Sequence, residues 1–317
     1  MKKGLLMLFC LFMLSRCFGQ SVKLVVAANG TGNYKTVQEA INAVPDNNDK
    51  VTIIFIKKGI YKEKLNVPPS KHNIKMIGED RDSTILTYDD YHSRKDSAGN
   101  EIGTSGSASI HIYGEGFSAE NITFQNSAGP VGQAVAVLAG GDKSYFKNCR
   151  FLGFQDTLYT HGNRLQLYVD CDIEGTVDFI FGTGTAWFQN CVIYCKRGGY
   201  ITAASTDENA KYGYVFKSCT ITGKAAAQTY FLGRPWKPYA KVVYISCTLG
   251  PQIKPEGWDF WGDISKQSTA YYAEYKNSGV GFTPAQRVAW SHQLTDEEVK
   301  NYTLANVLAG WNPEGGE

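Results

Sequence analysis

The 317-residue chain lacks the features that mark several common classes of protein. Its 32 Lys and Arg residues nearly balance 30 Asp and Glu, and it has no basic tract, so nucleic acid is not expected as a partner. It has no Cys-x-x-Cys pair and no histidine cluster, so we expect no metal site. It also lacks a Gly-x-Ser-x-Gly elbow, and Gly182-Thr183-Gly184 is without the third glycine of a dinucleotide loop. Neither a serine hydrolase nor a dinucleotide-dependent enzyme is therefore favoured.

Long apolar runs are missing beyond the N-terminus. Lys2 and Lys3 precede the apolar residues 5–14, and Cys17-Phe18-Gly19 offers small residues before a cut ahead of Gln20. These are the three parts of an export signal, and the run is too short to span a bilayer. We therefore predict a signal peptide at 1–19 and a single mature domain at 20–317. We expect a monomer without a membrane span that is periplasmic or secreted.

A four-residue phrase recurs in the mature chain every 20 to 28 residues. One copy is 148–151, Asn-Cys-Arg-Phe, and an earlier copy at 121–124 has Ile in the cysteine position. The later copies contain Cys171, Cys191, Cys219 and Cys247. Each copy alternates apolar and polar residues as a half-buried strand does, and one strand per repeat predicts a solenoid. The uneven intervals favour a parallel β-helix over leucine-rich repeats, so we predict an all-β, single-stranded parallel β-helix with short capping helices.

The cysteines of these repeats are expected to stack in one inward column. Such a column is explained equally well by small buried hydrophobic side chains and, in an exported protein, by disulfides. An adjacent pair such as Cys149 and Cys171 is the candidate for oxidation.

Three further segments have recognisable patterns. Capping boxes at Thr36–Glu39 and Thr295–Glu298 predict short helices that cover the two ends of the coil, the second running through Leu308. The polar, glycine-rich segment 88–107 predicts a long loop beside the coil.

Two pairs of polar residues share a register within the repeats. Asp156 and Asp178 each lie seven residues after a cysteine of the column, and Gln133 and Gln155 each lie sixteen residues before one. Members of a pair should therefore stack on adjacent coils, about 4.8 Å apart. Two close carboxylates cannot both ionise freely, so one can act as nucleophile and the other as general acid, while the amides stabilise an oxyanion. This arrangement suits acyl transfer, although an isolated Asp in such a position is more often a turn residue.

A cation is needed beside the buried Asp178, and Gly233-Arg234-Pro235-Trp236 supplies one. Arg234 could keep Asp178 ionised, and Trp236 offers a face on which a sugar can stack; the alternative is a surface turn with an incidental ion pair. The repeat count leaves Arg234 two coils, roughly 10 Å, from Asp178, so contact requires a loop that folds back.

Four motifs resemble the signature blocks of pectin methylesterases, in the order of that family. They are Gly132–Ala136, Gly153–Tyr159, Gly175–Gly182 and Leu232–Trp236, within a resemblance that extends from about Val25 to Trp311. The resemblance implies a right-handed parallel β-helix that hydrolyses the methyl esters of the polysaccharide homogalacturonan and releases methanol. It implies no metal or organic cofactor. The inhibitory pro-domain of many plant members is not found, which leads us to expect a bacterial enzyme.

The resemblance also implies roles for individual residues. Asp178 would attack the C6 carbonyl, and Asp156 would protonate methanol and then activate water. The remaining roles are oxyanion stabilisation by Gln133 and Gln155, orientation of the nucleophile and substrate contact by Arg234, a sugar subsite at Trp236, and a substrate contact at Ser127.

Three other functions are compatible with such a fold, and one of them is a related esterase with a different acyl substrate. A pectate lyase or polygalacturonase would need calcium-binding or further acids and would leave the glutamine pair unexplained. A non-catalytic carbohydrate-binding β-helix would give no reason for stacked carboxylates.

Overall fold

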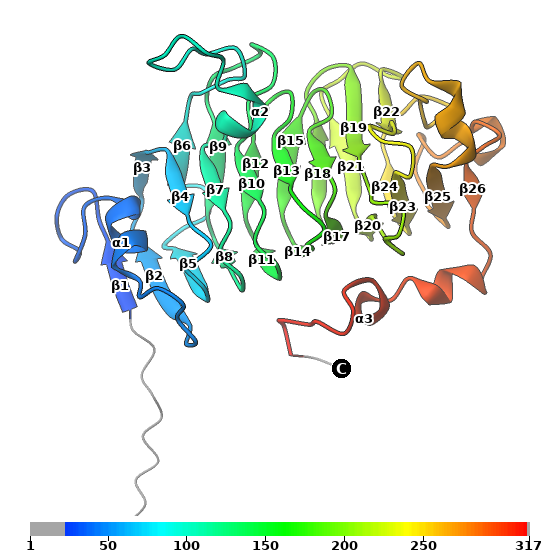
Figure 1. Ribbon diagram of the computed structural model, residues 1–317. Helices are drawn as coiled ribbons and strands as arrows, with labels where there is room; N and C mark the ends of the chain where they lie inside the picture. The colour runs from blue at the N-terminus through cyan, green and yellow to red at the C-terminus, as the bar shows by residue number, and fades with distance from the viewer. Residues whose placement is uncertain (1–22, 316–317) are drawn as a thin grey trace, which may run out of the picture.

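The computed structural model describes residues 23–315, and the signal peptide predicted at 1–19 lies outside the described residues. From β1 (Lys23–Val26) the chain winds into an elongated coil that ends near β26 (His292–Gln293) (Figure 1). Successive strands join three sheets in turn, and neighbouring strands of each sheet run parallel. The prediction of an all-β parallel β-helix is confirmed.

Each sheet is formed by strands from successive coils. The first sheet contains β1, β2 (Thr52–Ile56), β5 (Ile74–Gly78), β8 (Ser118–Glu120), β11 (Ser144–Lys147), β14 (Leu165–Val169), β17 (Thr185–Gln189), β20 (Tyr214–Lys217), β23 (Lys241–Ile245), β25 (Tyr271–Tyr275) and β26. The second contains β3 (Gly59–Lys62), β6 (Thr84–Tyr88), β9 (Thr123–Asn126), β12 (Arg150–Leu152), β15 (Asp172–Gly175), β18 (Val192–Cys195), β21 (Thr220–Gly223) and β24 (Thr248–Leu249). The third contains β4 (Leu65–Val67), β7 (Ile110–Ile112), β10 (Val137–Ala139), β13 (Leu158–Thr160), β16 (Ile180–Gly182), β19 (Gly199–Ala204) and β22 (Tyr230–Gly233).

The recurring phrase forms the corner between the first and second sheets. The residue before each inward position has a φ between 48° and 58° at Asn121, Asn148, Asp170, Asn190, Ser218 and Ser246. Asn and Asp tolerate this left-handed conformation better than most residues, because their short side chains bond locally. A single left-handed residue thus changes the direction of the chain at each corner, and the side chain of the next residue points into the coil.

The cysteines that follow these corners are buried and free. None of the six cysteines within residues 23–315 forms a disulfide, including the adjacent pair Cys149 and Cys171. Each of the five that follow a corner lies close to main-chain carbonyl oxygens, as Cys171 does with its Sγ 3.3 Å from the Val169 oxygen. The column is therefore one of small buried side chains.

A second internal column consists of stacked aromatic rings that the sequence analysis did not identify. Their centroids are 4.4 to 5.1 Å apart along Phe146, Tyr168, Phe188, Phe216 and Tyr244. Offset stacking adds to the stabilisation that burial alone gives. All five rings come from strands of the first sheet, so the column lines the inner side of that sheet.

The N-terminal cap agrees with the prediction. The Thr36 side chain accepts a hydrogen bond from the Glu39 amide, and Glu39 bonds back to Thr36. The resulting helix α1 (Val37–Ala43) packs against β1, β2 and β4 and so covers the first coil.

The prediction of a C-terminal capping helix is wrong in both length and place. Thr295 and Glu298 form a capping box, but only a 3-10 turn (Glu298–Asn301) follows it. Thr303 then begins α3 (Leu304–Val307) by accepting a hydrogen bond from the Asn306 amide. In Figure 1 this tail turns back along the coil, and α3 contacts β17 rather than covering the last coil.

The segment 88–107 is a loop, as predicted, except for the short helix α2 (Gly103–Gly106) near its end. The Ser105 carbonyl oxygen of α2 lies 2.8 Å from a ring nitrogen of His111 on β7, which fixes α2 beside the third sheet. Two more 3-10 turns, Ile264–Ser268 and Pro284–Gln286, lie in the C-terminal loops. Between residues 23 and 315, no helix combines the length and apolarity needed to cross a bilayer.

Candidate active site

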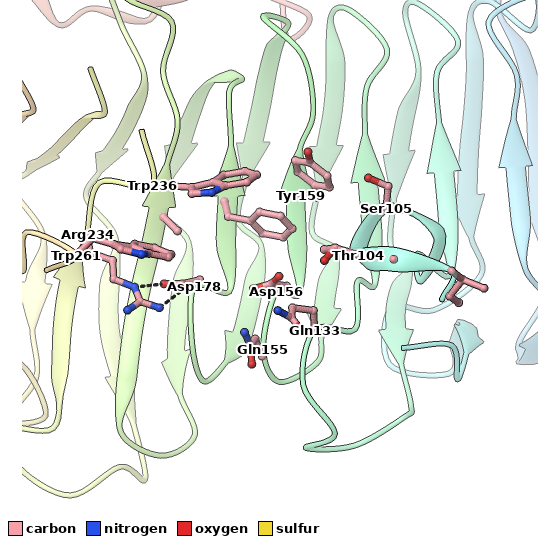
Figure 2. Close-up of a pocket in the computed structure, with 14 residues that line it drawn as sticks. Thr104, Ser105, Gln133, Gln155, Asp156, Tyr159, Asp178, Arg234, Trp236 and Trp261 are labelled. Carbon is pink, nitrogen blue, oxygen red and sulfur yellow. Dashed lines mark hydrogen bonds and ion pairs between the residues drawn. The ribbon is translucent and has the colours of Figure 1, made fainter. Parts of the chain in front are cut away.

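A cavity of about 440 Å³ lies over the third sheet at β13 and β16. Figure 2 shows its two carboxylates in the middle, the glutamines to one side and aromatic rings to the other. The lining residues are Ile102, Gly103, Thr104, Ser105, Gln133, Gln155, Asp156, Tyr159, Asp178, Phe181, Ala203, Arg234, Trp236 and Trp261.

Asp156 and Asp178 stack on adjacent coils, as their common register predicts. Leu158 pairs with Ile180, so the two Asp residues take equivalent places two residues before β13 and β16. Their φ angles are 64° and 52°, and only 7% and 5% of their surfaces are exposed. Both residues are therefore buried carboxylates that also form turns. Being a turn residue and being part of a carboxylate pair are not alternatives at these two positions.

Gln133 and Gln155 also stack, forming an isolated parallel bridge between their coils. Their main chains are held by neighbours: the Gln133 oxygen accepts from the His92 amide at 2.9 Å, and the Gln155 oxygen accepts from the Ala134 amide at 3.2 Å. Both side chains line the cavity beside the carboxylates (Figure 2).

Arg234 makes two hydrogen bonds to the carboxylate of Asp178. Its Nε donates to Oδ1 at 2.9 Å and its Nη2 to Oδ2 at 2.7 Å. This bidentate geometry is the strong form of a charge-assisted hydrogen bond. The expected fold-back loop is wrong: Arg234 directly follows β22, its amide bonds to the Thr202 oxygen one coil away, and the long side chain spans the remaining distance.

The two carboxyl groups differ in their electrostatic surroundings. Burial raises the pKa of Asp156 well above its ordinary value, and the nearby Asp178 raises it further, while Arg234 offsets part of the rise. Burial also raises the pKa of Asp178, but the hydrogen bonds and charge of Arg234 oppose that rise directly. Burial lowers the pKa of Arg234, but its bonds to Asp178 reverse the balance and leave that pKa raised. The arrangement favours a protonated Asp156 beside an ionised Asp178.

Aromatic rings form the opposite wall of the cavity. Tyr159 stacks on Phe181 with centroids 4.3 Å apart, and the Phe181 ring lies 6.1 Å from that of Trp236. Trp236 lines the cavity and is 36% exposed, so part of its indole is open to solvent. Aromatic rings beside a few polar groups are typical of ligand-binding pockets.

Ser127 lies outside this cavity. It is exposed, and its hydroxyl donates to the Tyr88 carbonyl oxygen at 3.0 Å. The geometry gives no support to a substrate contact by this residue.

Sequence reasoning missed two parts of the wall. Thr104 and Ser105 come from α2 inside the segment assigned to a loop, and Trp261 comes from a loop after β24. The only signal for Trp261 is its place in an aromatic run, Trp258-Asp259-Phe260-Trp261. No group of three or more His, Cys, Asp or Glu residues within the described chain is arranged to hold a metal ion.

The fold and the site together define a class: parallel β-helices whose third sheet carries a cavity with a pair of stacked, buried carboxylates. The Pectinesterase family model matches residues 23–311. The chain belongs to the pectinesterase family and is an ester hydrolase, as the resemblance of its motifs predicts.

The relatives cover most of the chain. Pectinesterase 31 from Arabidopsis thaliana is 42% identical over 283 residues, which are 87% of this chain and 89% of the relative. Other plant relatives whose names include a pectinesterase inhibitor are longer; the chain spans 54% of one from Arabidopsis thaliana. These plant relatives do not support the bacterial source that the sequence analysis expects.

Solved structures agree with the fold. Pectin methylesterase from carrot has a TM-score of 0.83 and 37% identity, with 90% of this chain and 93% of that chain covered. A pectin methylesterase in complex with hexasaccharide VII has a TM-score of 0.82 and 31% identity, with 92% and 98% covered.

Proposed function

We propose that the protein hydrolyses the methyl esters of galacturonate units in pectin and releases methanol. The observation that carries this proposal is the stacked pair Asp156 and Asp178, of which only Asp178 is held by a bidentate arginine. The names of the relatives and the hexasaccharide complex of a similar structure support the choice of substrate.

In the first step, ionised Asp178 attacks the C6 carbonyl carbon of the ester. The negative charge that develops on the carbonyl oxygen is stabilised by the side-chain amides of Gln133 and Gln155, which line the cavity beside it. As the tetrahedral intermediate collapses, the bond to the methoxy oxygen breaks and Asp156 transfers its proton to that oxygen. Methanol leaves, and an anhydride joins Asp178 to the sugar.

In the second step, Asp156 is ionised and acts as a base. It takes a proton from a water molecule whose oxygen attacks the same C6 carbon. The anhydride bond then breaks, Asp178 recovers its carboxylate with the help of Arg234, and the galacturonic acid is released. Asp156 is again protonated, so the cycle consumes one water and needs no metal ion or organic cofactor.

The aromatic wall is suited to hold the polymer. We infer that the open face of Trp236 stacks on a sugar ring next to the attacked unit, because the indole is exposed at the cavity rim. Arg234 would contact the substrate with the part of its guanidinium that Asp178 leaves free. The contact proposed for Ser127 lacks such support, since its hydroxyl bonds to Tyr88.

We also infer that the protein is exported, from the charged and apolar pattern of residues 1–19. A periplasmic or secreted location and a monomeric state stay predictions from the sequence.

The proposed function is tested by incubating the purified protein with highly methylated pectin. We expect methanol and new carboxyl groups in equal amounts, without ultraviolet-absorbing unsaturated products or new reducing ends. Unsaturated products would instead support a lyase, new reducing ends a polygalacturonase, and binding without any product a carbohydrate-binding role.

A further inference from the structure

The column of side chains that includes Asp156 and Asp178 continues beyond them along the coil. The strand register places Tyr200 on the coil after Asp178, and Phe231 on the coil after that. The two rings stack with centroids 5.4 Å apart and an angle of 10° between their planes. The Lys254 ammonium nitrogen lies 4.4 Å from the centre of the Phe231 ring. Tyr200 is therefore backed on one face by a stacked aromatic and cationic pair.

The other face of Tyr200 carries the guanidinium group of Arg234. The guanidinium carbon lies 3.8 Å from the centre of the Tyr200 ring and 3.6 Å from that of Trp261, so the group is sandwiched between two aromatic rings. Its edge is directed at Asp178 through the two hydrogen bonds. Because rings contact both faces of the planar guanidinium, its orientation is fixed. A bidentate contact requires such a fixed orientation.

We propose that Tyr200 is a positioning residue, which acts by fixing the plane of the Arg234 guanidinium so that both of its N–H groups reach Asp178. This inference rests on the proposed function, because it assigns to Arg234 the task of keeping the nucleophile ionised and oriented. Tyr200 does not line the cavity, so its effect on catalysis passes through Arg234 rather than through contact with the sugar.

Removal of the ring has a defined electrostatic consequence. A guanidinium that can rotate spends less time in the bidentate geometry, so the ionised form of Asp178 is stabilised less and its pKa rises. The other titratable groups that face this pair are Asp156, Asp259 and the buried Tyr272, and the substitution leaves all of them in place. The change in the acidic part of the pH profile therefore reports the Arg234–Asp178 contact.

The test compares Tyr200→Leu with Tyr200→Phe and with Tyr194→Leu in the full-length protein. Tyr194 lies on β18, in the second sheet of the same coil, and is partly buried like Tyr200, so Tyr194→Leu removes the same atoms from a different sheet. We expect Tyr200→Leu to lower kcat on the order of tenfold with little change in KM, because an aromatic face on a partly desolvated cation contributes by about that factor. The acidic midpoint of the pH profile should move to higher pH. Tyr200→Phe retains the ring and should restore the wild-type midpoint, and Tyr194→Leu should not move it.

The midpoint does not depend on the fraction of active protein, so partial misfolding cannot imitate the shift. The pKa of Asp178, followed by carbon NMR of the carboxyl group in the resting protein, gives the same test without turnover. An unmoved midpoint and an unmoved Asp178 pKa in Tyr200→Leu would overturn the inference. Failure of the wild-type protein to release methanol would instead overturn the proposed function, while the NMR result would still decide the role of Tyr200.

Discussion

At the scale of single residues, the site depends on two carboxyl groups with the same backbone geometry and different neighbours. Asp156 and Asp178 occupy the same corner on successive coils, but only Asp178 accepts two hydrogen bonds from Arg234. Burial raises the pKa of each; the charge of Arg234 opposes the rise at both, but only Asp178 also accepts its hydrogen bonds, which oppose the rise most strongly there. We therefore expect the equivalent positions to differ in protonation state and to take the separate chemical roles proposed above.

The first prediction concerns the pH dependence of this pair. Asp178 must be ionised to attack, so kcat/KM should fall as pH drops through its raised pKa. Asp156 must be protonated to donate, so kcat/KM should fall as pH rises through its still higher pKa. A bell-shaped profile of methanol release against pH is the expected outcome.

The variant Asp156→Asn removes the proton that methanol needs. We expect kcat/KM to fall by about a hundredfold or more and the alkaline limb to disappear. The same alkaline limb in Asp156→Asn as in the wild type would show that another group supplies the proton.

At the scale of elements, the same corner recurs in successive coils. In each, a residue in the left-handed conformation precedes one whose side chain points into the coil. The cysteines at these inward places contact main-chain oxygens of their own and the preceding coil, as Cys171 does with Val169 and Phe146. Burial raises the pKa of the Cys171 thiol well above its ordinary value, so little thiolate is available for oxidation.

The third prediction concerns the buried cysteines as a group. A thiol-specific reagent should label none of the six cysteines between Cys149 and Cys247 in the native protein and all six in denaturant. Peptide mapping of the labelled protein measures this directly, and a reducing agent should leave the Tm unchanged. A disulfide-linked peptide from any two of these positions would contradict the account.

The elements also show what the sequence can predict. Equal offsets from Cys149 and Cys171 were sufficient to stack the aspartates and the glutamines, because strand register in a coil is set by sequence spacing. Segments without that period could not be placed in this way. Trp261 and Ser105 reach the cavity from long loops whose path depends on tertiary contacts that no spacing encodes.

Two errors have different physical origins. The reach of Arg234 was underestimated because a repeat count measures the main chain and omits the length of the side chain. The helix predicted after Thr295 stops early because Thr303 caps a separate helix with its own side chain. The tail then follows the side of the coil, where Tyr212, Tyr302 and Val307 pack together.

At the scale of the whole molecule, an elongated coil carries the cavity on the outer face of its third sheet. Acids, amides and the arginine converge from coils that are rigid because their rings and corners stack (Figures 1 and 2). The chemistry needs little movement of the main chain, since its groups are already oriented in the resting state.

The most direct test of the account is the rate of methanol release by Asp178→Asn, measured beside Asp172→Asn. Asp172 lies six residues earlier on β15, outside the cavity, where its carboxylate pairs with Arg81 at 3.1 Å. With both variants folded as judged by circular dichroism, Asp178→Asn should lose at least about a thousandfold in kcat, because its side chain can no longer attack the ester, whereas Asp172→Asn should keep the wild-type rate. Methanol release by Asp178→Asn at the wild-type rate would contradict the central claim that this carboxylate is the nucleophile.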